Sequence, residues 1–124
     1  MSNKTAGTRA ERQLMHKLLN NGYAVLRVAG SGSAQFPACD LIAAKHGNIE
    51  AIEVKRVSLK DKCYIRKQQV EDLYYISAHF KAIPKIYVKF GYSIWLKYDK
   101  LNLRKTEKFY IAERNRGKIV KFIS

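Results

Sequence analysis

Charged residues interrupt the apolar stretch CDLIAAKHGNIEAIEVKR, which runs from Cys39 to Arg56, and three of them could act together. They are Asp40, Glu53 and Lys55. Two carboxylates held close together repel each other, and their burial is costly unless cations neutralise them. One lysine balances only one carboxylate, so a divalent ion is the best partner for the remaining charge. An all-oxygen set of ligands suits Mg²⁺ or Mn²⁺, ions that keep several waters and bind substrate phosphates.

The stretch predicts a β-hairpin that would bring these residues together. We expect strands over residues 40–45 and 49–56, joined by Gly47 and Asn48 as a two-residue turn. The first strand is an apolar run, and in the second the side chains alternate between two faces.

The register of this hairpin decides whether the charged residues meet. Glu53 and Lys55 share one face of their strand, because side chains alternate. If His46 pairs with Ile49, Asp40 lies opposite Lys55 on that face, with Glu53 diagonal to it. Paired residue numbers must then sum to an odd number, since a shift of one residue would turn Asp40 to the other face.

A fourth acidic residue precedes the hairpin. Apolar residues recur at helical spacing over residues 6–20, and Gly22 suits the end of such a helix. Glu11 falls inside the apolar stripe, so we expect its carboxylate to point at the sheet and the face with Glu53 and Lys55 to look at this helix. The alternative interpretation is a surface glutamate that the helix dipole tolerates near an N-terminus.

The charge balance suits a protein that binds a polyanion. The chain has 124 residues, and 24 Lys plus Arg against 10 Asp plus Glu leave a formal charge of +14. We expect one domain over residues 1–124. The cations are spread along the chain, no run approaches the roughly 20 apolar residues of a membrane span, and the N-terminal residues lack the apolar core of a secretory signal. These features favour an intracellular protein without a membrane partner.

The two cysteines, Cys39 and Cys63, form no metal-binding motif, and the three histidines lack ligand spacing. A structural zinc site is not expected, and free thiols are favoured over a disulfide.

The remaining pattern predicts an α/β fold with a mixed central sheet flanked by helices. The stretch YAVLRVA predicts a strand that enters the loop GSGSAQFPA, and VSLKDKCYI is interpreted as a basic loop. The further expected elements are a helix over residues 66–80, strands over 85–90 and 92–98, another strand in 108–113 and a short apolar end.

Together, these segments resemble the archaeal-type Holliday junction resolvases, a family of the metal-dependent nucleases that carry an Asp…Glu-x-Lys motif. The resemblance covers roughly residues 5–100 and is weaker in the C-terminal portion. Cys39 stands where the family often has proline before the aspartate. The matching segments are GTRAER, GYAVLRVAGSGS, DLIAA, IEAIEVK and YIRKQQVEDL.

The resemblance implies a restriction-endonuclease-like nuclease fold and a set of catalytic residues. Mg²⁺, or Mn²⁺ in its place, would be held by Glu11, Asp40 and Glu53, and Lys55 would be the catalytic lysine. The loop serine matches Ser31, with Ser33 as a second candidate, and a family glutamine matches Gln69. Contacts to DNA phosphates are expected from Arg9, Arg12, Arg27, Ser33, Lys60, Lys62 and Arg66.

The implied activity is hydrolysis of phosphodiesters in four-way DNA junctions by paired symmetric nicks, through water activated by a divalent metal. A homodimer is implied, because a junction has two-fold symmetry. Contact with a replication clamp and a cellular or viral origin stay open. One or two of five aromatic residues are expected as interface anchors: Tyr74, Tyr75, Phe80, Phe90 and Trp95.

Two other functions remain open on the sequence. The same metal site would serve a nuclease that cuts linear duplex DNA. Alternatively, the chain is a basic nucleic-acid-binding module, for DNA or RNA, in which Glu53 and Lys55 form only a structural salt bridge.

Overall fold

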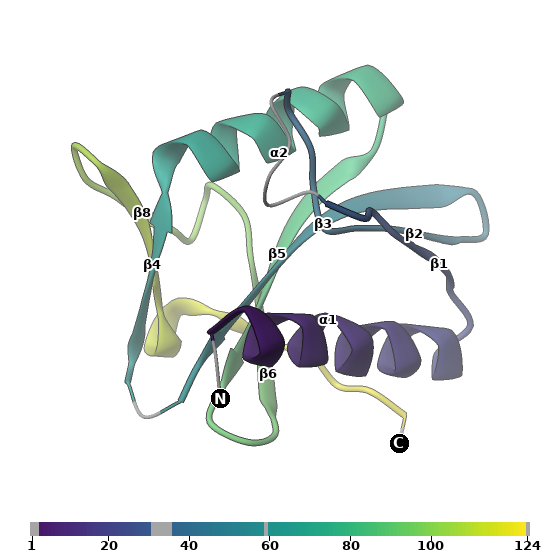
Figure 1. Cartoon of the computed structure of the whole chain (residues 1–124), viewed down its shortest axis with the longest axis horizontal. Coiled ribbons are helices and arrows are strands. Elements are labelled where there is room, and N and C mark those ends of the chain that lie inside the picture. The colour runs from purple at the N-terminus through teal and green to yellow at the C-terminus, as the bar shows by residue number, and fades with distance from the viewer. Residues whose placement is uncertain (1–2, 31–35, 59, 124) are drawn as a thin grey trace.

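A computed structural model describes residues 3–30, 36–58 and 60–123. Two helices pack on opposite faces of a central sheet, as Figure 1 shows. The helices are α1 (Asn3–Asn20) and α2 (Lys67–Phe80). Apolar residues four apart bury one stripe of α1, and they are Ala10, Leu14 and Leu18.

The described residues form a six-stranded sheet in the order β1-β2-β3-β5-β6-β9. Strands β3 and β5 are parallel, and the other neighbours are antiparallel, so the predicted mixed sheet is confirmed. The strands are β1 (Ala24–Arg27), β2 (Leu41–Lys45), β3 (Asn48–Val57), β5 (Ile83–Phe90), β6 (Ile94–Tyr98) and β9 (Lys118–Ile119).

A second, three-stranded sheet has the order β4-β8-β7 among the described residues. Its strands are β4 (Lys62–Arg66), β7 (Arg104–Lys105) and β8 (Phe109–Glu113), and a 3-10 helix, Arg114–Arg116, follows β8. The interpretation of residues 57–65 as a loop is therefore wrong for residues 62–65. Alternate side chains of β4 are buried, and this pattern stabilises a strand despite its charged residues.

The two faces of the central sheet carry separate cores. Helix α1 covers the face with Ile52 and Val54. Ala51 belongs to the other core, which includes Val70 and Leu73 of α2. Because Glu53 alternates with Ile52 and Val54, it lies on the α2 face, and the prediction that this face looks at the first helix is wrong.

Both cysteines are buried and free, as expected. Among the described residues, no helix is long and apolar enough to cross a membrane.

Candidate active site

The hairpin of β2 and β3 has the predicted parity but not the predicted pairing. Its turn is made by His46 and Gly47, with φ angles of 51° and 81°. Lys45 pairs with Asn48, two residues from the expected register. Because the difference is even, every side chain keeps its expected face, although the predicted pairing of Asp40 with Lys55 is wrong.

Asp40 lies just before β2 and is tied to β3 by two hydrogen bonds. Its backbone N–H donates to the carbonyl oxygen of Ile52 at 2.9 Å, and the N–H of Val54 donates to its Oδ2 at 2.8 Å. The side chain of Asp40 therefore continues the hairpin after the backbone ladder ends. This brings its carboxylate beside the segment that contains Glu53, closer than the predicted diagonal position.

Glu53 is a buried carboxylate with only 6% of its surface exposed. Burial, followed by the charge of Asp40, raises its pKa to about 8. Lys55 opposes this increase with Nζ 3.6 Å from Oε2 of Glu53. The environment therefore favours any cation that binds between the two carboxylates.

Lys55 is positioned from the α2 side of the sheet. Its Nζ donates a hydrogen bond of 3.0 Å to Oε1 of Gln69 in the first turn of α2. The side chain is partly buried, with 24% exposed. The structure thus brings together two residues, Lys55 and Gln69, that the sequence assigned to one site from distant segments.

Glu11 approaches from α1, on the other side of the sheet. Its Oε1 accepts a hydrogen bond of 2.9 Å from Nε of Arg27. Burial and the charge of Asp40 raise the pKa of Glu11, while Arg27 and Lys55 lower it. Glu11 therefore shares the electrostatic field of Asp40 and Lys55, although its carboxylate pairs with Arg27.

Asp40, Glu53 and Glu11 offer the oxygen ligands that Mg²⁺ prefers, and the pKa of Glu53 is raised by burial and then by the charge of Asp40. The described part of the chain nevertheless has no group of three Asp, Glu, His or Cys side chains already gathered for a metal ion. Movement of Glu11 away from Arg27 would complete a set of three carboxylates. The residue types therefore fit a divalent cation.

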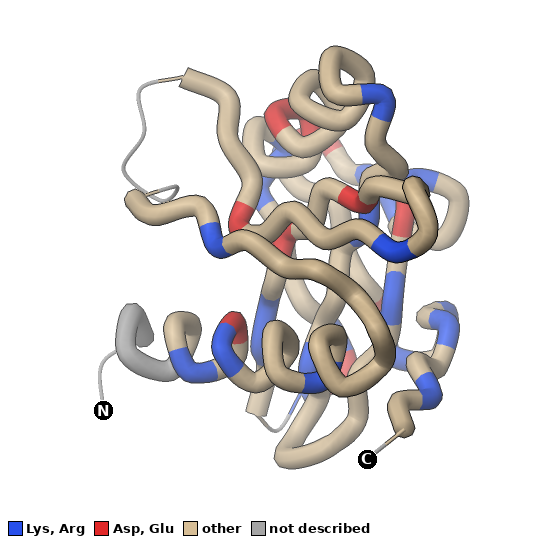
Figure 2. Tube along the Cα trace, turned by 90° about the vertical axis from the view of Figure 1, so that its right-hand side faces the viewer, with Lys and Arg blue, Asp and Glu red and all other residues tan. Residues whose placement is uncertain are grey.

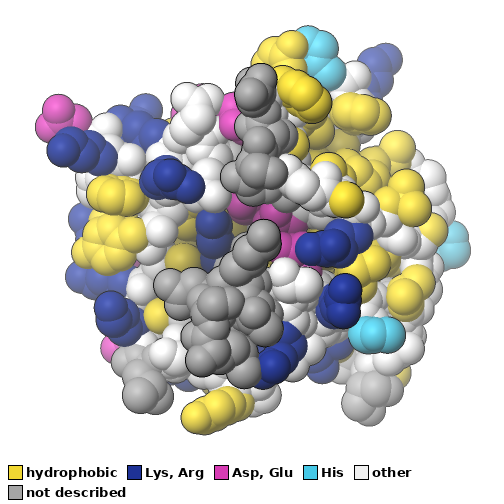
Figure 3. All heavy atoms as spheres, viewed as in Figure 1, with side chains coloured by type: hydrophobic (Ala, Val, Ile, Leu, Met, Phe, Trp, Pro, Cys, Tyr) yellow, Lys and Arg dark blue, Asp and Glu magenta, His cyan; other side chains and the backbone are white. Residues whose placement is uncertain are grey.

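Cations surround these acids. Figure 2 shows Lys and Arg positions along α1 and the strands, and Figure 3 shows acidic side chains at the centre of one face with Lys and Arg on both sides. Several of the predicted DNA-binding residues are exposed, among them Arg9 and Arg12 of α1, Lys60, and Lys62 at the start of β4. Arg66 is exposed at the end of β4. Ser31 and Ser33 lie outside the described residues.

One basic cluster was missed by the sequence analysis. Lys89 of β5 pairs in register with Arg56 of β3 and donates a hydrogen bond to Gln13 of α1. Burial, then Arg56, Lys17 and Arg9, lower the pKa of Lys89. This concentration of positive charge suits an anion, but it forms only when α1 packs on the sheet, so no local motif marks it.

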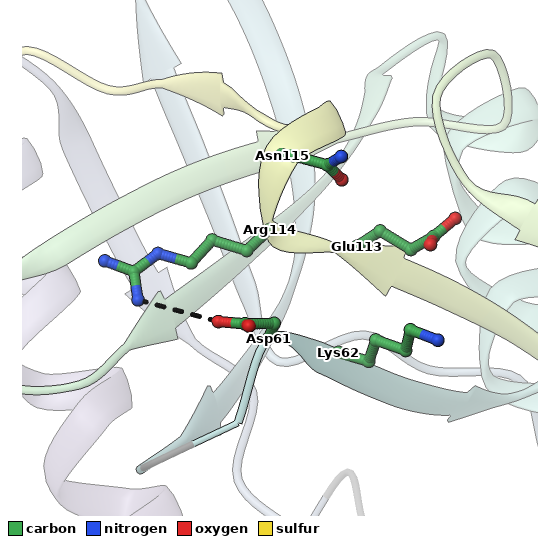
Figure 4. Close-up of a pocket in the computed structure, with 5 residues that line it drawn as sticks. All are labelled: Asp61, Lys62, Glu113, Arg114 and Asn115. Carbon is green, nitrogen blue, oxygen red and sulfur yellow. Dashed lines mark ion pairs between the residues drawn. The ribbon is translucent and has the colours of Figure 1, made fainter.

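An open pocket lies apart from the acids, at the edge of the small sheet. Figure 4 shows its lining residues, with Asp61 and Arg114 directed toward each other and an N–O separation of 3.9 Å. Its mixed charges, with Lys62, Glu113 and Asn115 completing the lining, do not resemble the acidic site.

Comparison with known proteins agrees with this geometry. The family model described as archaeal Holliday junction resolvase (Hjc) matches residues 2–123, well beyond the resemblance seen from sequence alone. The solved structure of Archaeoglobus fulgidus Hjc, a Holliday junction resolvase, superposes with a TM-score of 0.81 and 31% identity, covering 89% of this chain and 91% of that one.

Curated relatives have the same description in cellular and viral genomes. The crossover junction endodeoxyribonuclease Hjc of A. fulgidus is 35% identical over 85% of this chain and 76% of the relative. That of Sulfolobus acidocaldarius is 43% identical, with 59% of this chain and 52% of the relative covered. The crossover junction endodeoxyribonuclease of Sulfolobus islandicus rod-shaped virus 1 is 36% identical over 60% of each chain. From its fold, its acidic site and these matches, we conclude that this chain belongs to the archaeal Holliday junction resolvase family.

Proposed function

We propose that this protein is a structure-selective endodeoxyribonuclease that resolves four-way DNA junctions by hydrolysing phosphodiester bonds. The observation that carries the proposal is the buried Glu53 beside Asp40 and Lys55 in a chain with a formal charge of +14. A binding module gains nothing from a buried carboxylate beside a second one where a phosphate backbone must approach. A phosphodiesterase needs such a pair to hold a cation.

Asp40 and Glu53 would hold Mg²⁺, or Mn²⁺ in its place, and Glu11 would join them after leaving Arg27. When bound, such an ion activates water and neutralises charge that develops on the scissile phosphate. The three carboxylates would supply its protein ligands. Arg27, once released, becomes available to a DNA phosphate.

Lys55 would act as an electrostatic catalyst. Its cationic side chain would stabilise negative charge on the phosphoryl oxygens as water attacks in line. Gln69 would be a positioning residue, because its Oε1 accepts from Nζ of Lys55. Ser31 would position the scissile phosphate, with Ser33 as the second candidate.

The exposed cations would bind the DNA backbone. Phosphate contacts position a duplex without reading its bases, so we expect selectivity for branched shape and weak preference for sequence. The contacts proposed from the sequence are Arg9, Arg12, Arg27, Lys60, Lys62 and Arg66, to which the Lys89 cluster is added.

We also propose a homodimer, since paired nicks on a two-fold symmetric junction need two sites. Tyr75 and Phe80 are exposed by 53% and 61% at the C-terminal half of α2, near exposed Ile83. Figure 3 shows hydrophobic side chains gathered on that upper part of the molecule. Phe90 and Trp95 are buried in the core, so they are not available as anchors.

Cleavage of a synthetic four-way junction beside a linear duplex tests this function. We expect nicking of the junction with Mg²⁺ and much slower cleavage of the duplex. Glu53→Gln should reduce junction nicking by roughly a hundredfold or more, because it removes a cation ligand and its charge. Glu107→Gln, which changes an exposed glutamate, is the control.

Two outcomes would favour the rival functions. Equal rates on junction and duplex would identify a nuclease for linear DNA. Undiminished nicking by Glu53→Gln, with unchanged binding, would mean that the acids are structural. A readout independent of activity is thermal unfolding, in which Mg²⁺ should stabilise the wild type more than Glu53→Gln.

A further inference from the structure

We propose that the outer face of the small sheet is a platform on which an unstacked nucleobase of the bound DNA strand stacks, with Tyr64 as the stacking residue. This inference rests on the proposed function and names a DNA contact beyond the phosphate-binding cations. It concerns the strands β4, β8 and β7, which the acidic site does not use.

The platform arises from alternation along β4. Cys63 and Ile65 are buried, whereas Lys62, Tyr64 and Arg66 lie on the opposite, outer face. Tyr64, the central residue of β4, is 57% exposed. A tyrosine suits such a surface, because its hydroxyl is hydrated in the free protein and its apolar ring can be covered when DNA binds.

A second aromatic ring fixes Tyr64. The ring of Phe109 meets it edge to face, with centroids 5.6 Å apart, and Ile111 of β8 pairs directly with it in the sheet. Ile111 is buried beneath this surface. The exposed ring is therefore held in place by its neighbours, so little side-chain freedom is lost when a base covers it.

The charged residues differ between the two ends of the surface around Tyr64 and Phe109. At one end, Glu113 and Asp61 border the pocket in Figure 4, and Glu113 pairs with Arg104 at 3.1 Å. Asp61 pairs with Arg114 at 3.9 Å, so acids and cations at this end form ion pairs with each other. At the other end, Arg66 of β4 is exposed, and the residue opposite it on β8 is Phe109 and not an acid.

The Arg66 end of this surface leads toward the acidic site. Arg66 is the residue at the N-terminal cap of α2, and Gln69 in the first turn holds Lys55. On the inner side of β4, Cys63 lies within the field of the Lys55 ammonium, which opposes the increase of its pKa by burial. Figure 3 shows hydrophobic side chains flanked by Lys and Arg on the left, over β4 and β8, on the same face as the central acids.

A nucleobase fits this surface better than a protein does. An apolar partner would meet the exposed cations Lys62 and Arg66, whereas a nucleic-acid strand pairs those cations with phosphates and covers the rings with a base. Stacking is interrupted at the branch point of a junction, so a base there is easier to unstack than one within a duplex.

Binding measured without divalent ions tests the platform. Tyr64→Leu should weaken binding to the four-way junction by roughly tenfold, whereas Tyr64→Phe should stay within about twofold of wild type, since stacking needs the ring and not the hydroxyl. Linear duplex binding should change by less than about twofold in both variants. The matched control is Tyr92→Leu, at a tyrosine that is 91% exposed in the turn after β5.

Three results would overturn the inference: junction binding by Tyr64→Leu like that of wild type, an equal loss in Tyr64→Phe, or an equal loss on linear duplex. A measurement on the wild-type protein removes any dependence on the folding of variants. Junctions with 5-iododeoxyuridine next to the branch point are irradiated, and the cross-linked peptide is mapped. A cross-link to Tyr64 supports the platform, and its absence from every labelled position contradicts it.

These experiments distinguish failure of the proposed nuclease function from failure of the stacking platform. If the wild type fails to cleave the junction, the proposed function fails. If it cleaves the junction but Tyr64 neither cross-links nor contributes to junction binding, only the platform fails.

Discussion

At the scale of single residues, the buried carboxylate of Glu53 points to the candidate active site, because burying a charge costs free energy. A carboxylate in the middle of a central strand would be a defect in a protein without a use for it, because burial favours its protonated form. Here Asp40 adds to that cost, and Lys55 offsets only part of it. Alternation along one strand put Glu53 and Lys55 on the same face, and the predicted hairpin register added Asp40 to them.

Stability should depend on pH through Glu53. An unfolded glutamate titrates near 4.5 and the folded one near 8, so the folded state retains a proton that the unfolded state has lost between these values. The contribution to stability is present below pH 4.5 and is lost as pH rises toward 8. Glu53→Gln removes this dependence, so it should be more stable than wild type at pH 9, by up to roughly 4 kcal/mol, and similar at pH 4.

Urea unfolding of both proteins in metal-free buffer, at several pH values from 4 to 9, measures this difference. Glu107→Gln, at an exposed position, should follow the wild type throughout. A difference between Glu53→Gln and wild type that stays constant over the whole range would show that the carboxyl is not protonated in the folded state.

At the scale of elements, the β2–β3 hairpin is the device that aligns the acids. A two-residue turn with both φ angles positive matches the twist of paired strands, and His46 and Gly47 supply it. The expected turn at Gly47 and Asn48 was wrong by one residue, because histidine is an unusual residue for a positive φ. Asp40, Glu53 and Lys55 nevertheless stay on one face, because the register differs from the expected one by two residues, an even number.

The turn can be changed without touching the acids. Gly47→Ala should cost about 1–2 kcal/mol, because its φ of 81° is unfavourable for a residue with Cβ although the space around it is open. His46→Asn should raise the melting temperature slightly, because asparagine adopts positive φ more easily. Calorimetry measures both effects, and junction cleavage by folded protein should be unchanged. Loss of cleavage in Gly47→Ala at a temperature where it remains folded would show that the turn affects the site.

At the scale of the whole molecule, one group of exposed apolar side chains gathers at the C-terminal end of α2. The cations surround the acids, while exposed Tyr75, Phe80 and Ile83 lie at the end of α2 and the start of β5. A face rich in large apolar side chains is typical of an interface, and two-fold pairing would leave both acidic sites open to one junction.

Sedimentation tests this arrangement. Phe80→Glu should convert a dimer into monomers at micromolar concentration, because burying an unpaired carboxylate at an apolar interface is unfavourable. Tyr92→Glu, at a more exposed aromatic residue elsewhere, should leave the dimer intact. Junction cleavage by Phe80→Glu should then yield single nicks in place of paired ones. A wild-type protein that sediments as a monomer would contradict the proposed dimer.

The sequence by itself determined which charged residues lie within apolar strands. The period of two residues in a strand and of 3.6 residues in a helix then assigned each side chain to a face. That was enough for the mixed fold, the two helices and the grouping of Asp40, Glu53 and Lys55. Only the tertiary structure decided that α2 and not α1 covers this group, that Gln69 holds Lys55, and that Arg27 holds Glu11. The same is true of β4, whose charged residues suggested a loop until packing against β8 buried alternate positions. Local periodicity specifies which side of an element is apolar, but the element that covers that side is chosen by packing between distant segments.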